Sequence, residues 1–134
     1  LTVIMPGKVK RNLQSLVVAQ AAVTALVSAF GREMLKLELR DLPTGYEAYL
    51  VTPLSNEDAK RETCRIEDTH PLGRLFDLDV IDSDGVPVSR GSIGLSPRKC
   101  LVCDNEARFC MRNRTHTMAE LSAKIDEMIE AYVR

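Results

Sequence analysis

The chain has 134 residues, of which 45% are hydrophobic and 28% are charged, and these values are ordinary for one soluble globular domain. Its formal net charge of -1 argues against binding nucleic acid through overall charge. Polar residues at Gln20, Thr24 and Ser28 interrupt the longest apolar stretch, so we expect no membrane-spanning segment. We therefore expect one domain over 1–134, with no membrane or nucleic-acid partner.

The sequence opens on Leu1 rather than Met, and it enters a strand-like run at once. No charged leader with a small-residue cleavage site comes before that run, so nothing indicates secretion. We expect a cytoplasmic protein, and we expect that an N-terminal segment is missing from this sequence.

The first third of the chain predicts a strand, a helix and a hairpin. Leucines alternate with charged residues around Leu37, and Pro43 and Gly45 mark the turn that follows. Before this hairpin, apolar residues recur at helical spacing. In chain order the predicted elements are a strand over 2–5 ended by Pro6-Gly7, a helix over 8–30 capped by Gly31, and strands over 35–39 and 46–51.

Capping signals begin two further helices. Ser55 and Asp58 have the spacing of an approximate capping box, and Thr117 and Glu120 form a full one. Between them, apolar residues alternate with aspartates over 76–80, which indicates a strand. The predicted elements are a helix over 56–68, a strand over 76–80, a turn over 82–85 with a short return over 86–90, and a final amphipathic helix.

The order strand, helix, strand, strand, helix, strand is the βαββαβ pattern of ferredoxin-like α+β folds, with an antiparallel sheet covered by helices on one face. We expect this core to span 1–90. A Cys-rich and Arg-rich segment and the last helix, over 91–134, are expected to pack on it. A nucleotidyltransferase-like mixed sheet is the alternative topology.

Asp77 and Asp79 lie two residues apart on a predicted strand, so both are expected to project from one face. Two adjacent carboxylates repel each other unless a cation or strong donors lie between them. Mg²⁺ prefers one or two carboxylates together with substrate phosphates. The pair is therefore a candidate magnesium site, although a solvated polar face has the same pattern.

The segment before this strand combines groups that suit a phosphate ligand. Gly73 allows a backbone to approach a ligand closely, and Arg74 carries a forked guanidinium that binds phosphate oxygens. His70 is a candidate base for an attacking hydroxyl, although a lone histidine is more often structural. Further on, 90–114 contains six basic residues and two acidic ones, which indicates either a partner or ligand rich in phosphate or carboxylate, or a solvated face.

Three of the four cysteines lie close together. Cys100, Cys103, Cys110 and His116 have the residue types of a Cys₃His zinc site, with a CxxC pair at its start. Reduced thiols packed between the last helices are the alternative. Cys64 lies apart at an apolar helical position, so we expect a buried, inert thiol there.

Several of these segments together resemble one known family. The stretch His70-Pro-Leu-Gly-Arg-Leu-Phe-Asp-Leu-Asp-Val80 is similar to the most recognisable motif of the apo-citrate lyase phosphoribosyl-dephospho-CoA transferases, also called holo-citrate lyase synthases. The resemblance extends to the opening Thr2–Lys10, to Ser89-Arg90, to Pro97-Arg-Lys-Cys-Leu-Val-Cys103, and to Cys110 and Thr115-His116. The chain departs from the family at Lys8 and Asn113-Arg114, and it lacks the tens of residues that members carry before the first strand.

The resemblance implies a nucleotidyltransferase-type enzyme that modifies a carrier protein. It would transfer the phosphoribosyl-dephospho-CoA group from 2'-(5''-triphosphoribosyl)-3'-dephospho-CoA to a serine of the citrate lyase acyl carrier protein, and diphosphate would leave. Under this hypothesis Asp77 and Asp79 hold Mg²⁺, Arg74 and Arg90 bind phosphates, and His70 deprotonates the serine or binds phosphate. Gly73, Arg98 and Lys10 are further substrate-binding candidates.

Two other functions fit the same residues. The chain could be a small zinc-stabilised binding module in which the aspartate pair is structural. It could also be a metal-dependent nucleotidyltransferase that acts on another acceptor. Under the transferase hypothesis, the basic segment over 98–114 would complement the charge of an acidic carrier protein.

Overall fold

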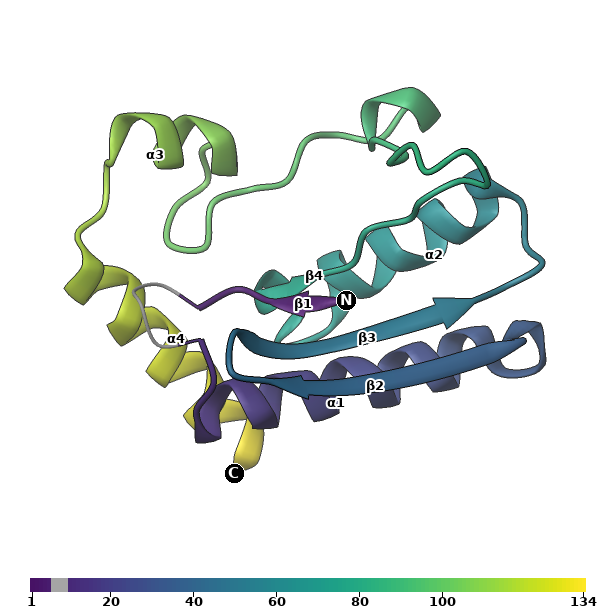
Figure 1. Ribbon diagram of the computed structural model, residues 1–134. Helices are drawn as coiled ribbons and strands as arrows, with labels where there is room; N and C mark the ends of the chain where they lie inside the picture. Colours follow the sequence, from purple (N-terminus) through teal and green to yellow (C-terminus); the bar gives the residue numbers. More distant parts are fainter. Residues whose placement is uncertain (6–9) are drawn as a thin grey trace.

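The computed structural model describes residues 1–5 and 10–134, so the predicted Pro6-Gly7 break lies outside the described residues. It is an α+β structure of antiparallel strand pairs and helices (Figure 1). The helices are α1 (Leu13–Phe30), α2 (Asn56–Thr69), α3 (Ala107–Asn113) and α4 (Met118–Val133). The strands are β1 (Thr2–Val3), β2 (Lys36–Leu42), β3 (Gly45–Val51) and β4 (Phe76–Asp77), and 3-10 turns lie at η1 (Gly31–Glu33), η2 (Gly73–Leu75) and η3 (Gly91–Ile93).

The strands form two antiparallel pairs. In one pair Thr2 of β1 lies opposite Asp77 of β4, and in the other β2 and β3 form the predicted hairpin. Backbone hydrogen bonds connect the pairs, because Leu1 and Ala48 donate to each other's carbonyl oxygens at 2.9 and 3.3 Å. Helix α1 packs against β3 and α2 on one side of these strands (Figure 1).

The hydrophobic core lies between the helices and the strands. It joins residues of α1, α2, the η2–β4 segment and α4, among them Val18, Leu26, Ile66, Phe76 and Ile125. By length and composition Leu13–Glu33, with a mean hydropathy of 1.7, is apolar enough to cross a membrane despite its polar residues, but a buried core helix passes the same test. The contribution of α1 to the core accounts for its apolar composition.

Helix α1 begins at Leu13, later than the predicted start at Lys8. Asn12 has an extended backbone, and its Oδ1 accepts the Ser15 N–H at 2.8 Å. Ser15 Oγ accepts the Asn12 N–H at 2.8 Å in return, which completes a capping box. Because this box satisfies the first free N–H groups, it fixes the helix start at that point.

The strand predicted over 76–80 ends at Asp77. The Leu78 N–H donates to the Glu67 carboxylate at 2.9 Å instead of continuing the strand pairing. The predicted turn and return are confirmed, since the Val88 N–H bonds to the Val80 carbonyl at 2.8 Å and Gly85 has a φ of 80° in the turn. The sequence did not predict α3, whereas α4 and its capping box are confirmed.

Candidate functional site

A buried carboxylate organises the basic residues that follow α2. Glu67, in the last turn of α2, is only 4% exposed. Its Oε1 accepts from Arg90 Nη2 at 2.7 Å, and its Oε2 accepts the Leu78 N–H and lies 3.5 Å from Arg98 Nη1. One acid therefore holds two arginines that come from distant parts of the sequence.

We use the term arginine cluster for Arg74, Arg90 and Arg98, and its members differ in how their donors are used. Arg90 also pairs with Asp68 at 3.1 and 3.2 Å, so its guanidinium is well satisfied. Arg98 Nη2 donates to the Gly73 carbonyl at 2.7 Å. Arg74 Nε and Nη1 and Arg98 Nε are buried without a hydrogen-bond partner among the described residues.

The unsatisfied guanidinium of Arg74 makes this cluster a candidate anion site. Burial lowers the pKa of Arg74, and the positive charges of Arg98 and Arg90 lower it further. A buried cation without a partner is costly because it has lost its hydration. A phosphate oxygen would supply both the missing acceptor and the missing charge.

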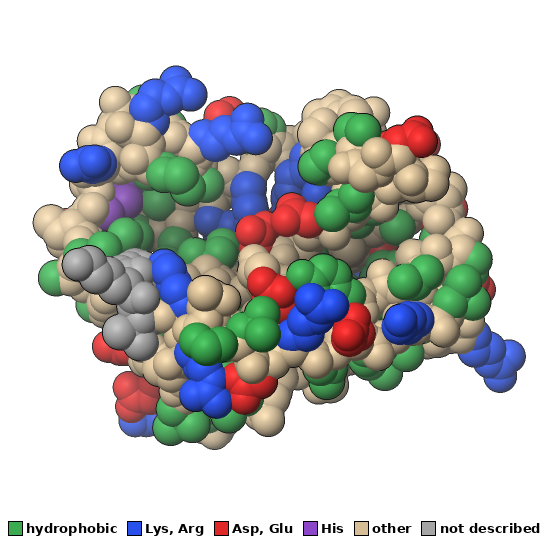
Figure 2. Space-filling model, viewed as in Figure 1, with side chains coloured by type: hydrophobic (Ala, Val, Ile, Leu, Met, Phe, Trp, Pro, Cys, Tyr) green, Lys and Arg blue, Asp and Glu red, His purple; other side chains and the backbone are tan. Residues whose placement is uncertain are grey.

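The aspartate pair lies next to the arginine cluster. Asp77 is half-buried at the end of β4, where Thr2 Oγ1 donates to it at 3.4 Å. Burial raises the pKa of Asp77, Asp79 raises it further, and Arg98 lowers it, so all three charges are close together. Figure 2 shows acidic and basic side chains around a hollow in the middle of the face that carries β1 and β4.

His70 lies apart from these charges. Its ring packs on Phe76 and Tyr132, with centroids 4.8 and 5.6 Å away, and burial lowers its pKa. Its Nδ1 accepts the Leu72 N–H at 3.0 Å, which in the neutral ring places the proton on Nε2. Because Phe76 and Asp77 are consecutive in a strand, their side chains face opposite ways. The contact with Phe76 therefore puts His70 on the face away from Asp77, and its role as a base stays a prediction.

Two of the predicted substrate-binding residues, Gly73 and Lys10, have local structural roles. A Cβ on Gly73 would lie 2.2 Å from the Glu67 carbonyl oxygen, so the close approach at this glycine is to the backbone of α2. Lys10 is exposed, and its Nζ donates to the Met5 carbonyl. Neither residue contacts the aspartate pair in the hydrogen bonds of the described chain.

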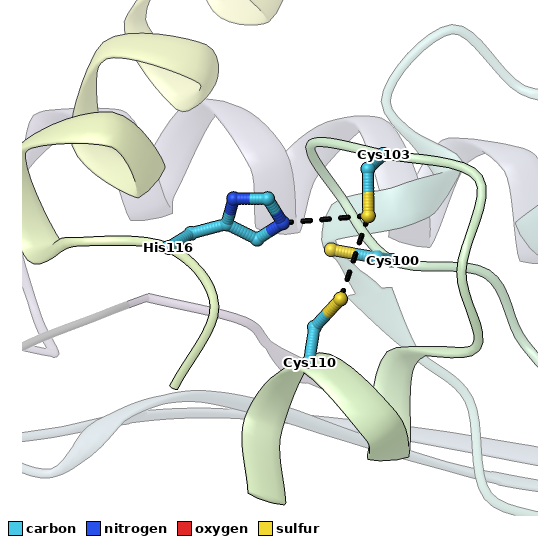
Figure 3. Close-up of side chains that lie close together, drawn as sticks. All are labelled: Cys100, Cys103, Cys110 and His116. Atoms are coloured by element: carbon cyan, nitrogen blue, oxygen red, sulfur yellow. Dashed lines mark hydrogen bonds between the residues drawn. The ribbon is translucent and has the colours of Figure 1, made fainter. Parts of the chain in front are cut away.

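The predicted cysteine and histidine residues form a compact group, the Cys₃His cluster. Cys100 and Cys103 come from the loop before α3, Cys110 from α3, and His116 from the segment before α4, and their side chains point toward one another (Figure 3). Their ligand atoms all lie within 4.8 Å of one another. A hydrogen bond from the Asn105 backbone N–H and, to a smaller extent, one with His116 lower the pKa of Cys103 to about 7. Cys64 is buried elsewhere with a pKa raised by burial, as predicted for an inert thiol.

A cavity of about 280 Å³ joins the two clusters. Its walls are mostly apolar, with Ile4, Met5 and Leu121 among the lining residues. Arg74 lines it from one cluster, and Cys110 and His116 line it from the other. The cavity can therefore receive a ligand that has both an anionic and an apolar part.

Glu67 is the main site residue that the sequence reasoning missed. It lies three and seven positions after Cys64 and Lys60, which are both buried in α2. An acidic residue on the buried face of a predicted helix was therefore a usable signal. It required a cationic partner, and the basic residues downstream offered one.

Comparisons with known proteins identify the family of this chain. A family model described as apo-citrate lyase phosphoribosyl-dephospho-CoA transferase matches residues 1–132. A probable apo-citrate lyase phosphoribosyl-dephospho-CoA transferase of Vibrio cholerae serotype O1 (strain M66-2) is 42% identical, over 98% of this chain and 76% of the relative. One of the same name from Streptococcus pyogenes serotype M18 is 36% identical, over 98% of this chain and 70% of the relative. The chain belongs to the apo-citrate lyase phosphoribosyl-dephospho-CoA transferase family.

Proposed function

We propose that this chain transfers the phosphoribosyl-dephospho-CoA group from 2'-(5''-triphosphoribosyl)-3'-dephospho-CoA to a serine of the citrate lyase acyl carrier protein. The serine oxygen bonds to the innermost phosphorus of the triphosphate and loses its proton, the bond from that phosphorus to the next bridging oxygen breaks, and diphosphate leaves. The family name supports the reaction. The observation that carries the site is the Arg74 guanidinium, whose Nε and Nη1 are buried and have no partner among the described residues.

Arg74 and Arg98 are the phosphate ligands in this proposal. Both have buried donors without acceptors in residues 1–5 and 10–134, and charge on the transferring and leaving phosphates must be neutralised as the bond breaks. Arg90 has its guanidinium engaged by Glu67 and Asp68, so we assign it as a positioning residue that holds Glu67 in place. The sequence alone predicted that Arg90 contacts phosphate directly, and we replace that role with the positioning role.

We further propose Mg²⁺ at Asp77 and Asp79. Carboxylate oxygens suit this ion, and the repulsion that raises the pKa of Asp77 would be relieved by a cation between the two groups. Mg²⁺ bound there would offset negative charge on the triphosphate oxygens. The adjacent arginine cluster would bind the other phosphate oxygens.

The transfer assay is carrier-protein labelling followed by intact-mass measurement with purified donor. Arg74→Met should abolish the mass gain without lowering the unfolding midpoint, because it removes a half-buried charge with two buried donors that have no partner in the described part of the chain. Arg32→Gln, at an exposed arginine in η1, is the matched control and should label the carrier normally. Near-normal labelling by Arg74→Met would refute the anion site, and an unchanged carrier mass with active donor and the native chain would refute the transfer itself.

The magnesium proposal has its own variants. Asp77→Asn and Asp79→Asn should each abolish labelling while circular dichroism stays native, since Asn keeps the shape but removes the charge that binds the cation. Labelling should also require added Mg²⁺ in the native chain. Near-normal labelling by both variants would remove the magnesium assignment and leave the arginine cluster unaffected.

We also propose that the four strands form one ferredoxin-like sheet in the order β4–β1–β3–β2. The backbone hydrogen bonds between Leu1 and Ala48 support the central pairing, and α1 and α2 pack against each other beside it. We propose a cytoplasmic location, and docking of the acidic carrier protein on the exposed basic residues Arg108, Arg112 and Arg114.

A further inference from the structure

We propose that Cys100, Cys103, Cys110 and His116 bind one structural Zn²⁺ ion and that Glu120 orients His116. The residues come from separate segments, yet their ligand atoms lie within 4.8 Å of one another. Cys103 Sγ is 3.4 Å from Cys110 Sγ and 3.4 Å from His116 Nε2. Two sulfurs on a tetrahedral zinc at about 2.3 Å are roughly 3.8 Å apart, so small side-chain shifts would complete the geometry.

The donor set identifies the ion and its role. Three thiolates and an imidazole are soft and borderline ligands that favour zinc over magnesium or calcium. Four protein ligands fill a tetrahedron and leave no open position for substrate or water, which is typical of a structural site. The Val102 N–H donates to Cys100 Sγ at 3.4 Å, which supports the thiolate form of that ligand.

Glu120 has the position of a supporting carboxylate. With Nε2 of His116 toward Cys103, the opposite nitrogen Nδ1 lies 3.7 Å from Glu120 Oε2. Metal-bound histidines commonly donate their second N–H to a carboxylate, which fixes the tautomer and the ring orientation. The other oxygen of Glu120 accepts the Thr117 N–H at 3.1 Å in the capping box, so α4 holds this carboxylate in place.

A Cys103–Cys110 disulfide is the competing use of these sulfurs, and the surroundings argue against it. Such a bond would leave Cys100 and His116 beside it with no role, although both point at the same centre (Figure 3). A metal uses all four side chains.

The zinc would fix the backbone that carries Arg98. Arg98 comes two residues before Cys100, and its carbonyl accepts the Ala107 N–H at 2.8 Å, while the Cys100 N–H bonds to the Asn105 carbonyl at 2.7 Å. The ion would thus hold this loop against α3 and the start of α4, along one wall of the cavity that Arg74 also lines. The link to phosphate binding rests on the proposed function, whereas the zinc site does not.

Metal content tests the site without donor or carrier protein. Protein expressed with added zinc should contain one zinc per molecule, measured by inductively coupled plasma mass spectrometry. Replacement of the zinc by Co²⁺ should give thiolate charge-transfer bands and the strong visible absorption bands of a tetrahedral site. Cys103→Ala and Cys110→Ala should lose the metal, whereas Cys64→Ala, at the buried cysteine outside the cluster, should keep one zinc. A metal-free native chain, or an intact mass lower by two hydrogens from a Cys103–Cys110 disulfide, would overturn the proposal.

Two measurements keep the test decisive if a cysteine variant does not fold. A chelator should lower the unfolding midpoint of the native chain, and added Zn²⁺ but not Mg²⁺ should restore it. Glu120→Gln keeps the capping-box acceptor and should retain one zinc with about 10- to 100-fold weaker affinity. Unchanged zinc affinity in this variant would refute the role of Glu120, and an unfolding midpoint insensitive to both chelator and zinc would refute a structural ion. A zinc-replete chain that fails to label the carrier would contradict only the proposed function.

Discussion

The substitution Gly73→Ala tests the packing that places the arginine cluster. A Cβ at this position would lie 2.2 Å from the Glu67 carbonyl oxygen and 2.7 Å from both the Glu67 carbonyl carbon and the Ile66 carbonyl oxygen. These atoms belong to the backbone of the last turn of α2 and cannot rotate away, so η2 must shift. Overpacking of this kind costs about 3 kcal/mol when neighbours cannot give. For a chain of this length, that cost lowers the unfolding midpoint by roughly 10 °C.

The assay is urea and thermal unfolding followed by circular dichroism, with Gly91→Ala as the control. Gly91 has open space around its Cβ position, so that variant should be neutral or slightly stabilising. Carrier labelling should also fall in Gly73→Ala, because the Gly73 carbonyl accepts from Arg98 and Arg74 follows it directly. If Gly73→Ala were as stable as Gly91→Ala, the close approach to α2 would be wrong and a ligand-facing role for this glycine would be favoured.

Two further predictions concern buried titratable groups. Glu67→Gln should lower the free energy of unfolding by about 3 kcal/mol in urea titrations, because it leaves buried arginines without their counter-charge. Asp68→Asn, at the exposed partner of Arg90, should cost less than about 1 kcal/mol, and equal losses would contradict the buried network. Burial lowers the pKa of His70 below its usual value of about 6.5, so the unfolded chain takes up a proton there before the folded chain does. The folded chain therefore loses stability as the pH falls from about 6.5 to the folded pKa. His70→Asn keeps an acceptor for the Leu72 N–H and should reduce the change in the unfolding midpoint between about pH 7.5 and pH 5. An unchanged pH dependence of the midpoint would show that His70 is not its source.

Much of the secondary structure was readable because its signals are local. The capping residues Ser55 and Thr117 start their helices as predicted, and the turn at Pro43 joins the predicted hairpin. The four members of the Cys₃His cluster are also brought together as their spacing suggested. In each case a few neighbouring residues determine the conformation, so one sequence is sufficient.

The errors occur where distant residues decide the outcome. The β4 strand is short because Glu67, eleven residues earlier, takes the Leu78 N–H, and no local pattern contains that bond. Leu39 is 61% exposed in β2 although its alternation predicted a half-buried face, because alternation shows that a face exists but not that another layer covers it. His70 and Asp77 are near in sequence, yet the strand places them on opposite faces.

We interpret the arginine cluster and the Cys₃His cluster as parts of one site, whose formation reduces the stability of the free chain. Within the residues that the structure describes, Arg74 and Arg98 have buried donors without acceptors, which destabilises the free chain. Such groups are typical of sites that a ligand completes. Glu67 pairs with Arg98 from the core side, and the proposed zinc in the Cys₃His cluster, which begins two residues after Arg98, would fix its backbone from the other side. An arginine whose side chain and backbone are both fixed loses little conformational entropy when a phosphate binds. Most of the free-energy cost of ordering Arg98 would therefore arise on folding and not on binding. This arrangement predicts that donor binding stabilises the chain most strongly when both Glu67 and the Cys₃His cluster are intact.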